Sequence, residues 1–286
     1  MNLIRNVILI ANQNIRKWST NYKVWFVAIY IIIVDIYICQ NLTTACLDTN
    51  MKISQWILPH LLSSYLIALI WLLVPLVVLF CDAPFLDDTQ PYIIIRSNRK
   101  VWAMGQVLYI IIASFLYAIY MFIASVIANI ANITFTLGWG EFIDNTLANS
   151  WLSKNINGYF FIDDFIFKHF EGYQATWFSI MYLWLGAIFV GLTMFLVNSI
   201  TNSKIFGVAV AGVEVVLVNL AYFDMLFMRY VPLAWVNLAN VAVTNNDEYC
   251  PSFTYTMIAY AVIFIVLLTA IFIHNRKRTI EVLPPV

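Results

Sequence analysis

Charged side chains gather between residues 80 and 106 of a chain that is otherwise strongly apolar. This stretch reads FCDAPFLDDTQPYIIIRSNRKVWAMGQ, in a protein of 286 residues of which only 10% are charged. Its charged residues are Asp82, Asp87, Asp88, Arg96, Arg99 and Lys100. Asp87 or Asp88 can cap a short helix, and Pro91 suits the first turn of that helix. A short helix with both charge signs beside apolar residues indicates a protein-docking element, although the bases can also serve only to set membrane topology.

Two further acids, Asp35 and Glu214, stand within apolar runs. An ionisable side chain in hydrocarbon costs about 2.5–3.5 kcal/mol on insertion scales, so it is expected to face protein or water. We expect both acids to line a path for a substrate and to meet its cationic parts. Two alternatives stay open: Asp35 lies near the outer interface, or Glu214 forms hydrogen bonds across a dimer.

The sequence lacks the residues of a nucleotide-hydrolysing site. No lysine follows a glycine anywhere in the chain, so there is no Gly-x-x-x-x-Gly-Lys-Ser/Thr loop to hold phosphates. The three histidines, His60, His169 and His274, fall in separate parts of the chain, and no His-Glu-x-x-His or Gly-x-Ser-x-Gly motif occurs. We expect the chain to be no enzyme and to hold neither a metal nor a cofactor of its own.

The composition is that of an all-α integral membrane protein. Hydrophobic residues make up 63% of the chain, aromatic residues make up 16%, and the mean hydropathy is +0.84. A soluble domain is about half apolar and about a quarter charged. The formal net charge of zero gives no support to nucleic-acid binding, which favours a basic surface.

Six stretches approach the roughly 20 apolar residues that a membrane-spanning helix needs. They cover roughly residues 24–40, 59–80, 104–132, 177–199, 205–224 and 254–273. This order places both termini, the 81–103 loop and the 200–204 turn on one side of the membrane. Only four of the 15 basic residues then fall on the other side, namely Lys52, Lys154, Lys168 and Arg229. Because basic residues stay inside, both termini are predicted in the cytoplasm.

Three segments outside the spans have a distinct character. Residues 1–22 place apolar side chains at helical spacing among basic ones, which predicts an amphipathic helix lying on the cytoplasmic leaflet. The external segment 133–176 is too long for a connector and is expected to form short interfacial helices. Residues 229–252, between the fifth and sixth spans, are too short and interrupted to cross, and predict an external re-entrant hairpin.

Two weaker patterns concern pairing. Cys46 and Cys250 both fall outside the cell, where a disulfide between them could persist. Cys39 is another possible partner, and free thiols are the alternative. Gly207 and Ala211 give the fifth span a face of small residues, which allows close helix contact. That face predicts either a dimer contact or packing within one subunit.

The run from Pro91 to Gln106 carries a resemblance to a known family, together with the order of the elements around it. An interfacial helix and two spans precede the DDTQPYIIIRSNRKVWAMGQ loop, and a third span that opens LYIIIASFLY follows it. Over nearly its whole length, the chain resembles the permease subunit of ATP-binding-cassette exporters of type 2. Within that family it is most similar to exporters of amphipathic peptides, such as the phenol-soluble-modulin toxins, from Gram-positive bacteria.

This resemblance implies a location in the bacterial plasma membrane and a complex of several chains. Two permease copies, expected as a homodimer, would carry two ATP-binding subunits, which hold the ATP and Mg²⁺. The cytoplasmic loop 82–103 would contain the coupling helix that docks on the ATPase. Its contact residues would be Asp87, Asp88, Pro91, Tyr92, Arg96, Arg99 and Lys100. The first, second and fifth spans would line the path and the dimer contact, and the 229–252 hairpin would close the outer end.

The expected function is therefore export of hydrophobic or amphipathic peptides, driven by ATP hydrolysis on a separate subunit. Lipid, glycan or drug remains open as the cargo. An immunity or sensor protein that does not transport, and captures a toxin on its 133–176 segment, is the alternative from another class.

Overall fold

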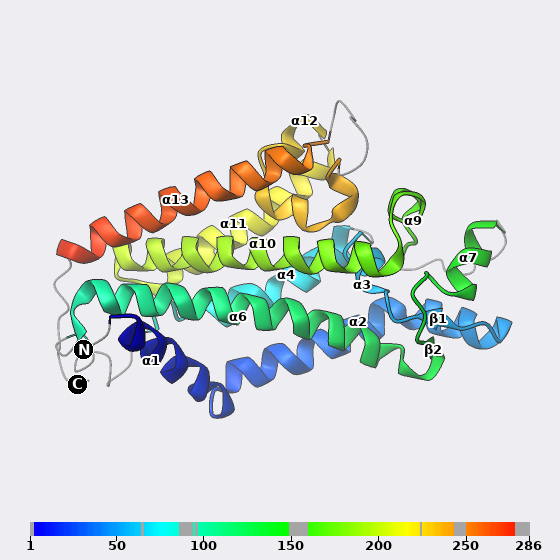
Figure 1. Ribbon diagram of the computed structural model, residues 1–286, viewed down its shortest axis with the longest axis horizontal. Coiled ribbons are helices and arrows are strands. Elements are labelled where there is room, and N and C mark those ends of the chain that lie inside the picture. The colour runs from blue at the N-terminus through cyan, green and yellow to red at the C-terminus, as the bar shows by residue number, and fades with distance from the viewer. Residues whose placement is uncertain are drawn as a thin grey trace.

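The computed structural model describes residues 3–63, 66–85, 94, 97–148, 160–223, 225–242 and 250–277. These residues fold into a bundle of long helices, with small elements at one end (Figure 1). The helix α1, the start of α6 and the last turn of α13 lie at the left end of this view. Two short strands and the helices α7 and α9 lie at the right end.

Five described helices are long and apolar enough to cross a membrane. They are α2 (Tyr22–Thr49), α6 (Arg99–Ala128), α10 (Gly172–Thr201), α11 (Lys204–Phe223) and α13 (Phe253–Lys277). The central helix is α10, since 67% of its most apolar stretch is buried, against 17% for α13. The prediction of an all-α membrane protein is thus supported.

The predicted second span corresponds to two helices, α3 (Leu58–Ser63) and α4 (Leu66–Phe80). Residues 64 and 65 lie outside the described chain. Alone, α4 has 15 residues, fewer than the roughly 20 that a span needs. A sixth span therefore stays a prediction.

The ends of the long helices follow from their capping residues. The Asn21 side chain accepts a hydrogen bond from the Lys23 amide at the start of α2, and the helix ends at Asn50, whose φ is 54°. Glu171 and Gln174 form a capping box at the start of α10, and Asn202 ends that helix with a φ of 52°. Asparagine tolerates this left-handed conformation better than most residues, so it suits both turns.

The first span is longer than the sequence predicts. It runs to Thr49 instead of ending near residue 40. Its threonine hydroxyls donate to carbonyls one turn back, as Thr43 does to Cys39 at 3.0 Å and Thr44 does to Gln40 at 2.6 Å. These polar side chains are therefore satisfied within the helix and do not end it.

A helix does form near the N-terminus. It is α1 (Leu3–Arg16), and the 3₁₀ turn η1 (Lys17–Ser19) follows it. The helix packs along α6, where Ile10 lies against Gly105 and Asn14 donates to Gln106 at 2.6 Å. Its other face exposes Leu3, Ile4, Ile8 and Leu9. The two faces fit the predicted amphipathic helix, whose place on a leaflet stays a prediction.

The segments predicted to be external fold against one another. The strands β1 (Ile53–Ser54) and β2 (Ile133–Thr134) pair in parallel. The 3₁₀ turn η2 (Ile130–Asn132) directly precedes β2. The short helices α7 (Glu141–Ala148) and α9 (Asp164–His169) follow, as expected of the 133–176 segment. Trp139 fixes this region by donating its indole hydrogen to the Phe170 carbonyl at 2.9 Å.

The central turns of the predicted hairpin are largely buried. They are η3 (Pro232–Val236) and η4 (Leu238–Asn240), after the short helix α12 (Met225–Met228). Trp235 is 1% exposed and donates to the Met228 carbonyl at 3.0 Å, and the Tyr260 hydroxyl of α13 donates to the Pro232 carbonyl at 2.8 Å. These turns pack against α10. The re-entrant position of these turns in the membrane stays a prediction.

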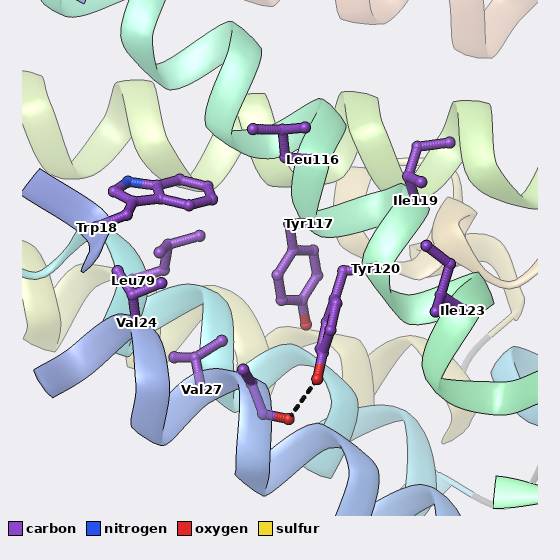
Figure 2. A pocket seen from close by; sticks show the side chains of 10 residues that line it. Trp18, Val24, Val27, Leu79, Leu116, Tyr117, Ile119, Tyr120 and Ile123 are labelled. Atoms are coloured by element: carbon purple, nitrogen blue, oxygen red, sulfur yellow. Dashed lines mark hydrogen bonds between the residues drawn. The ribbon is translucent and has the colours of Figure 1, made fainter. Parts of the chain in front are cut away.

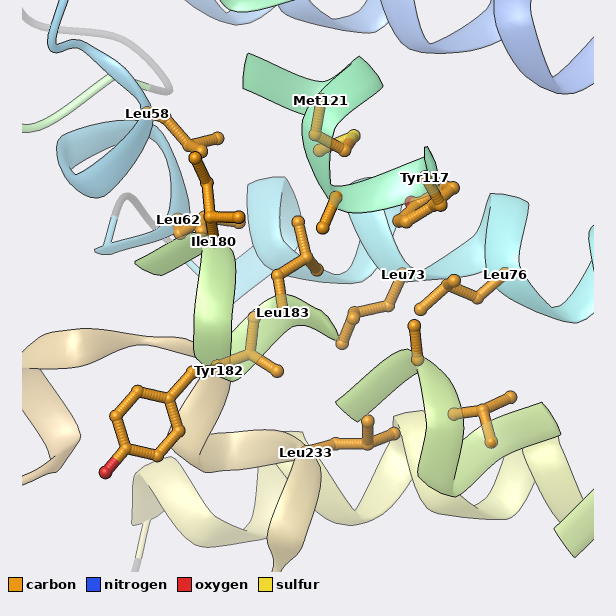
Figure 3. Close-up of a cluster of buried hydrophobic side chains, with 14 of the residues drawn as sticks. Leu58, Leu62, Leu73, Leu76, Tyr117, Met121, Ile180, Tyr182, Leu183 and Leu233 are labelled. Atoms are coloured by element: carbon orange, nitrogen blue, oxygen red, sulfur yellow. The ribbon is translucent and has the colours of Figure 1, made fainter. Parts of the chain in front are cut away.

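Buried leucines join these elements into one core (Figure 3). Leu58 and Leu62 of α3 and Leu73 and Leu76 of α4 meet side chains of α6, α10 and η3 there. The other labelled members are Tyr117, Met121, Ile180, Tyr182, Leu183 and Leu233. The helix α4 packs against α2, α10 and α11, and this packing also holds the turn that follows α4.

Candidate functional site

The turn at residues 81–85, directly after α4, carries the best-defined charged contacts of the described chain. One Asp82 oxygen lies 2.5 Å from Nζ of Lys23 at the start of α2, and the other lies 2.8 Å from Nζ of Lys204 at the start of α11. Burial alone would raise the pKa of Asp82, but the hydrogen bonds from Lys204 and Lys23 outweigh it and lower that pKa. Asp82 is therefore a stable anion that joins two helices. We call Asp82, Lys23 and Lys204 the lysine–aspartate junction.

A second link ties the same turn to the α10–α11 connection. Asn198 donates from Nδ2 to the Ala83 carbonyl at 2.7 Å and accepts at Oδ1 from the Gly207 amide at 2.8 Å. Asn198 is 2% exposed, so both bonds lie away from solvent and hold more firmly than surface contacts. The turn is thereby fixed to α10 and α11 as well as to α2.

A polar pocket of about 220 Å³ lies beside the junction. Trp18 donates from its indole to the Tyr109 hydroxyl at 2.9 Å within it, which joins η1 to α6. The lining residues are Asn14, Lys17, Trp18, Asn21, Asp82, Phe85, Tyr109 and Lys204. We call this space the head pocket.

An apolar cavity of about 350 Å³ lies on the other side of Trp18 (Figure 2). The first turns of α2, the end of α4 and the middle of α6 form its walls. Tyr120 crosses between two of them, because its hydroxyl donates to the Ala28 carbonyl at 2.8 Å. The lining residues are Trp18, Val24, Val27, Ala28, Leu79, Leu116, Tyr117, Ile119, Tyr120 and Ile123. We call this space the tail cavity.

The structure describes only part of the predicted coupling loop. Asp87, Asp88, Pro91, Tyr92 and Arg96 lie outside the described residues. Arg99 and Lys100 begin α6, where Lys100 is exposed and Arg99 is half-buried. The junction therefore stands immediately before the undescribed part of the loop, and α6 begins immediately after it.

The two intramembrane acids lie apart. Asp35 has no exposed surface, and neither of its carboxylate oxygens has a hydrogen-bond partner among the described residues. Glu214 is half-buried on α11 and accepts a hydrogen bond from the Thr193 hydroxyl of α10 at 3.3 Å. In this conformation Asp35 is enclosed by protein, so it does not face an open path.

The small residues of α11 point into their own subunit. Ala211 is 0% exposed, and Gly207 is buried against Asn198. Both residues pack within the chain, as the second interpretation of this face expected. The dimer contact assigned to them needs correction, because no surface of either is left for a partner.

The predicted disulfide also needs correction. Cys46 forms no bridge and is 1% exposed inside α2, because that helix extends nine residues beyond the predicted end of the span. Cys250 is half-buried, next to residues that the structure does not describe. No Cys46–Cys250 bridge is present.

No group of three His, Cys, Asp or Glu side chains that could hold a metal occurs in the parts of the chain that the structure covers. No family model, curated protein or solved structure matches this chain. Its site must therefore be interpreted from its own contacts. The lysine–aspartate junction joins helices, and Lys23 also donates to Sγ of Cys81 at 3.2 Å.

The sequence analysis assigned Asp82 to the charged loop but did not predict the residues with which it forms ion pairs. Lys23, Asp82 and Lys204 each stand at the predicted cytoplasmic end of a span. Their common level in the membrane is the only sequence signal that could have brought them together. No comparable pattern in the sequence predicted the head pocket or the tail cavity.

Proposed function

We propose that this chain is the transmembrane subunit of an ATP-driven exporter of hydrophobic or amphipathic peptides. ATP and Mg²⁺ would be held by a separate ATP-binding subunit, since the chain carries no phosphate-binding loop. The resemblance of the 82–103 loop to the coupling loop of type 2 exporters suggests this function. A second copy of the chain would complete the transport path.

One observation supports the proposal above the others. Asp82, directly before the undescribed part of the loop, binds the first turns of both α2 and α11. A force applied to the loop by a partner would therefore reach two helices at once, through one charged contact that is partly buried, to Lys23, and one that is exposed, to Lys204. A loop that only set topology would need no such connection.

The proposed mechanism follows from this connection. Closure of the ATP-binding subunits moves the loop, and the junction passes the movement to the starts of α2 and α11. The exposed side of α11, with Val208, Val213 and Val216, would then change its contact with the second copy. Glu214 on the same helix, and Asp35 once it is uncovered, would meet cationic groups of the cargo.

Co-purification with an ATP-binding subunit encoded beside this chain tests the proposal. We expect a stable complex, and we expect Arg99→Glu with Lys100→Glu to abolish it because both bases flank the loop. Lys168→Glu is the matched control, since Lys168 is an exposed base on α9 at the other end of the molecule. Candidate peptides should stimulate the ATPase activity of the parent complex. If no ATP-binding subunit co-purifies, the exporter proposal fails and the sensor or immunity function is favoured.

A further inference from the structure

Two large apolar side chains stand uncovered directly after β2, at the end of the molecule opposite the start of α6 (Figure 1). Phe135 is 82% exposed and Leu137 is 74% exposed. The residue between them, Thr136, is held by Gln55, which accepts from its amide at 3.1 Å and donates to its carbonyl at 3.0 Å. Trp56 donates to the same carbonyl at 2.7 Å. Three hydrogen bonds therefore fix the backbone that carries these side chains. We call Phe135 and Leu137 the apolar tip.

Two polar contacts on α2 show where a bilayer would lie. Lys23 binds Asp82 near the start of the helix. Farther along, the Thr43 hydroxyl donates to the Asn129 side chain at 3.3 Å, and the Thr43 carbonyl accepts from Asn132 at 3.3 Å. The helical length from Lys23 to Thr43 is about 30 Å, which is about the thickness of the hydrocarbon core. Asn129 and Asn132 therefore lie at the membrane boundary opposite the lysine–aspartate junction, and the apolar tip follows them closely in the chain.

An exposed apolar row leads along α6 toward the tip. Ile123 and Ile127 of α6 and Ile130 of η2 are all exposed, and their spacing places them on one side of the helix. In a helix that crosses a bilayer, such a row faces acyl chains. No charged residue occurs between Lys100 and Glu141, so the row and the tip are uncharged throughout. The continuity of the tip with a lipid-facing row favours lipid over protein as its partner.

We propose that the apolar tip inserts into the leaflet opposite the lysine–aspartate junction, where headgroups meet acyl chains. An aromatic and an aliphatic side chain suit that depth. The tip carries no charge, so it does not select one lipid headgroup over another. Its insertion holds β1 and β2 at a fixed height over the bilayer. This inference requires only that the long helices cross a membrane, so it is independent of the export proposal.

Fluorescence of the full chain in phosphatidylcholine nanodiscs tests the position of the tip. Cys81 and Cys250 are first replaced by alanine, since the other two cysteines are buried. A thiol-reactive fluorophore is then attached to Phe135→Cys or, as the control, to Asp144→Cys, at an exposed acidic position on α7. Lipids with a nitroxide near the headgroup should quench the Phe135→Cys label and spare the Asp144→Cys label, and iodide in the buffer should do the reverse.

Two outcomes of this experiment would overturn the proposal. Quenching of the Phe135→Cys label by iodide would place the tip in water. Protection of that label from both quenchers would mean that a protein surface, such as a second copy of the chain, covers it.

A pair of variants tests whether the tip anchors the strands. Phe135→Ser combined with Leu137→Ser removes the apolar surface, and Phe161→Ser is the control, because Phe161 is 49% exposed just before α9. Deuterium exchange of the backbone amides of residues 53–56 is measured in nanodiscs. We expect several-fold faster exchange in the double variant and no change in the control. Thermal unfolding checks that both are folded, and exchange at the parent's rate in a folded double variant would contradict the anchoring role.

Discussion

The carboxylate of Asp82 accepts a hydrogen bond from the ammonium of Lys204 at 2.8 Å, although 122 residues separate them in the chain. Its other oxygen binds Lys23. The turn after α4 is thus tied to the first residues of α2 and α11, which are not neighbours in sequence. A single carboxylate sets the relative positions of three helices at this end.

Replacing Asp82 with Asn should destabilise the protein. Asn keeps the shape but loses the charge, so both lysines lose an anionic partner. Because Asp82 is 31% exposed and Lys204 is 60% exposed, we expect a loss of about 1 kcal/mol at most per ion pair. Thermal unfolding in detergent measures it. Asp164→Asn, which breaks the pair with Lys168, whose side chains are 65% and 60% exposed, should cost less; an equal cost would show that the junction has no special role.

The same junction predicts how stability depends on pH. The hydrogen bonds from the lysines lower the pKa of Asp82 in the folded protein below its usual value. Folding therefore favours the ionised form, and its contribution is present above the unfolded pKa of about 4. It is lost as the pH falls through the lower folded pKa. Melting temperatures from pH 7 to pH 3 should fall more steeply for the parent than for Asp82→Asn, and parallel curves would contradict this assignment.

Two glycines of α11 should respond oppositely to alanine. A methyl group at Gly207 would collide with the Asn198 amide, whereas a methyl group at Gly212 would meet nothing within 4 Å. Gly207→Ala should cost about 1–3 kcal/mol as an overpacked contact. Gly212→Ala should stabilise the helix by about 0.5–1 kcal/mol. Unfolding in detergent compares them; a tolerated Gly207→Ala would reopen this face as a dimer contact.

Asp35→Asn should leave the protein as stable as the parent or make it more stable. The buried carboxylate has no hydrogen-bond partner among the described residues, so an amide of the same shape loses no contact and avoids a buried charge. Asn198→Ala is the comparison, because it removes two observed hydrogen bonds and should lower the melting temperature by several degrees. A large loss for Asp35→Asn would mean that the carboxylate has a bound partner.

The positions of the long helices were largely predictable from the sequence, because a run of about twenty apolar residues in a membrane must form a helix to satisfy its backbone hydrogen bonds. Their ends were less predictable. Hydropathy predicted that the first span ends near residue 40. The hydroxyls of Thr43 and Thr44 donate hydrogen bonds to carbonyls of the same helix, so α2 continues past that point. That extension also placed Cys46 inside a helix, away from the predicted disulfide.

The site was much less predictable than the spans. The face that carries Gly207 and Ala211 was recognised, but no local pattern says whether such a face meets its own chain or another. The contacts of Asp82 join residues that are 59 and 122 positions apart. Such pairing depends on how α2, α4 and α11 pack, which hydropathy does not specify.

The helix α13 has a consequence for biosynthesis. It packs mainly on α10 and touches the bundle through Tyr260 and through His274, which lies 2.9 Å from the Ser199 carbonyl. All of these partners leave the ribosome before α13 does. The last helix can therefore dock onto a bundle that is already assembled, and errors in its insertion should leave the earlier helices folded.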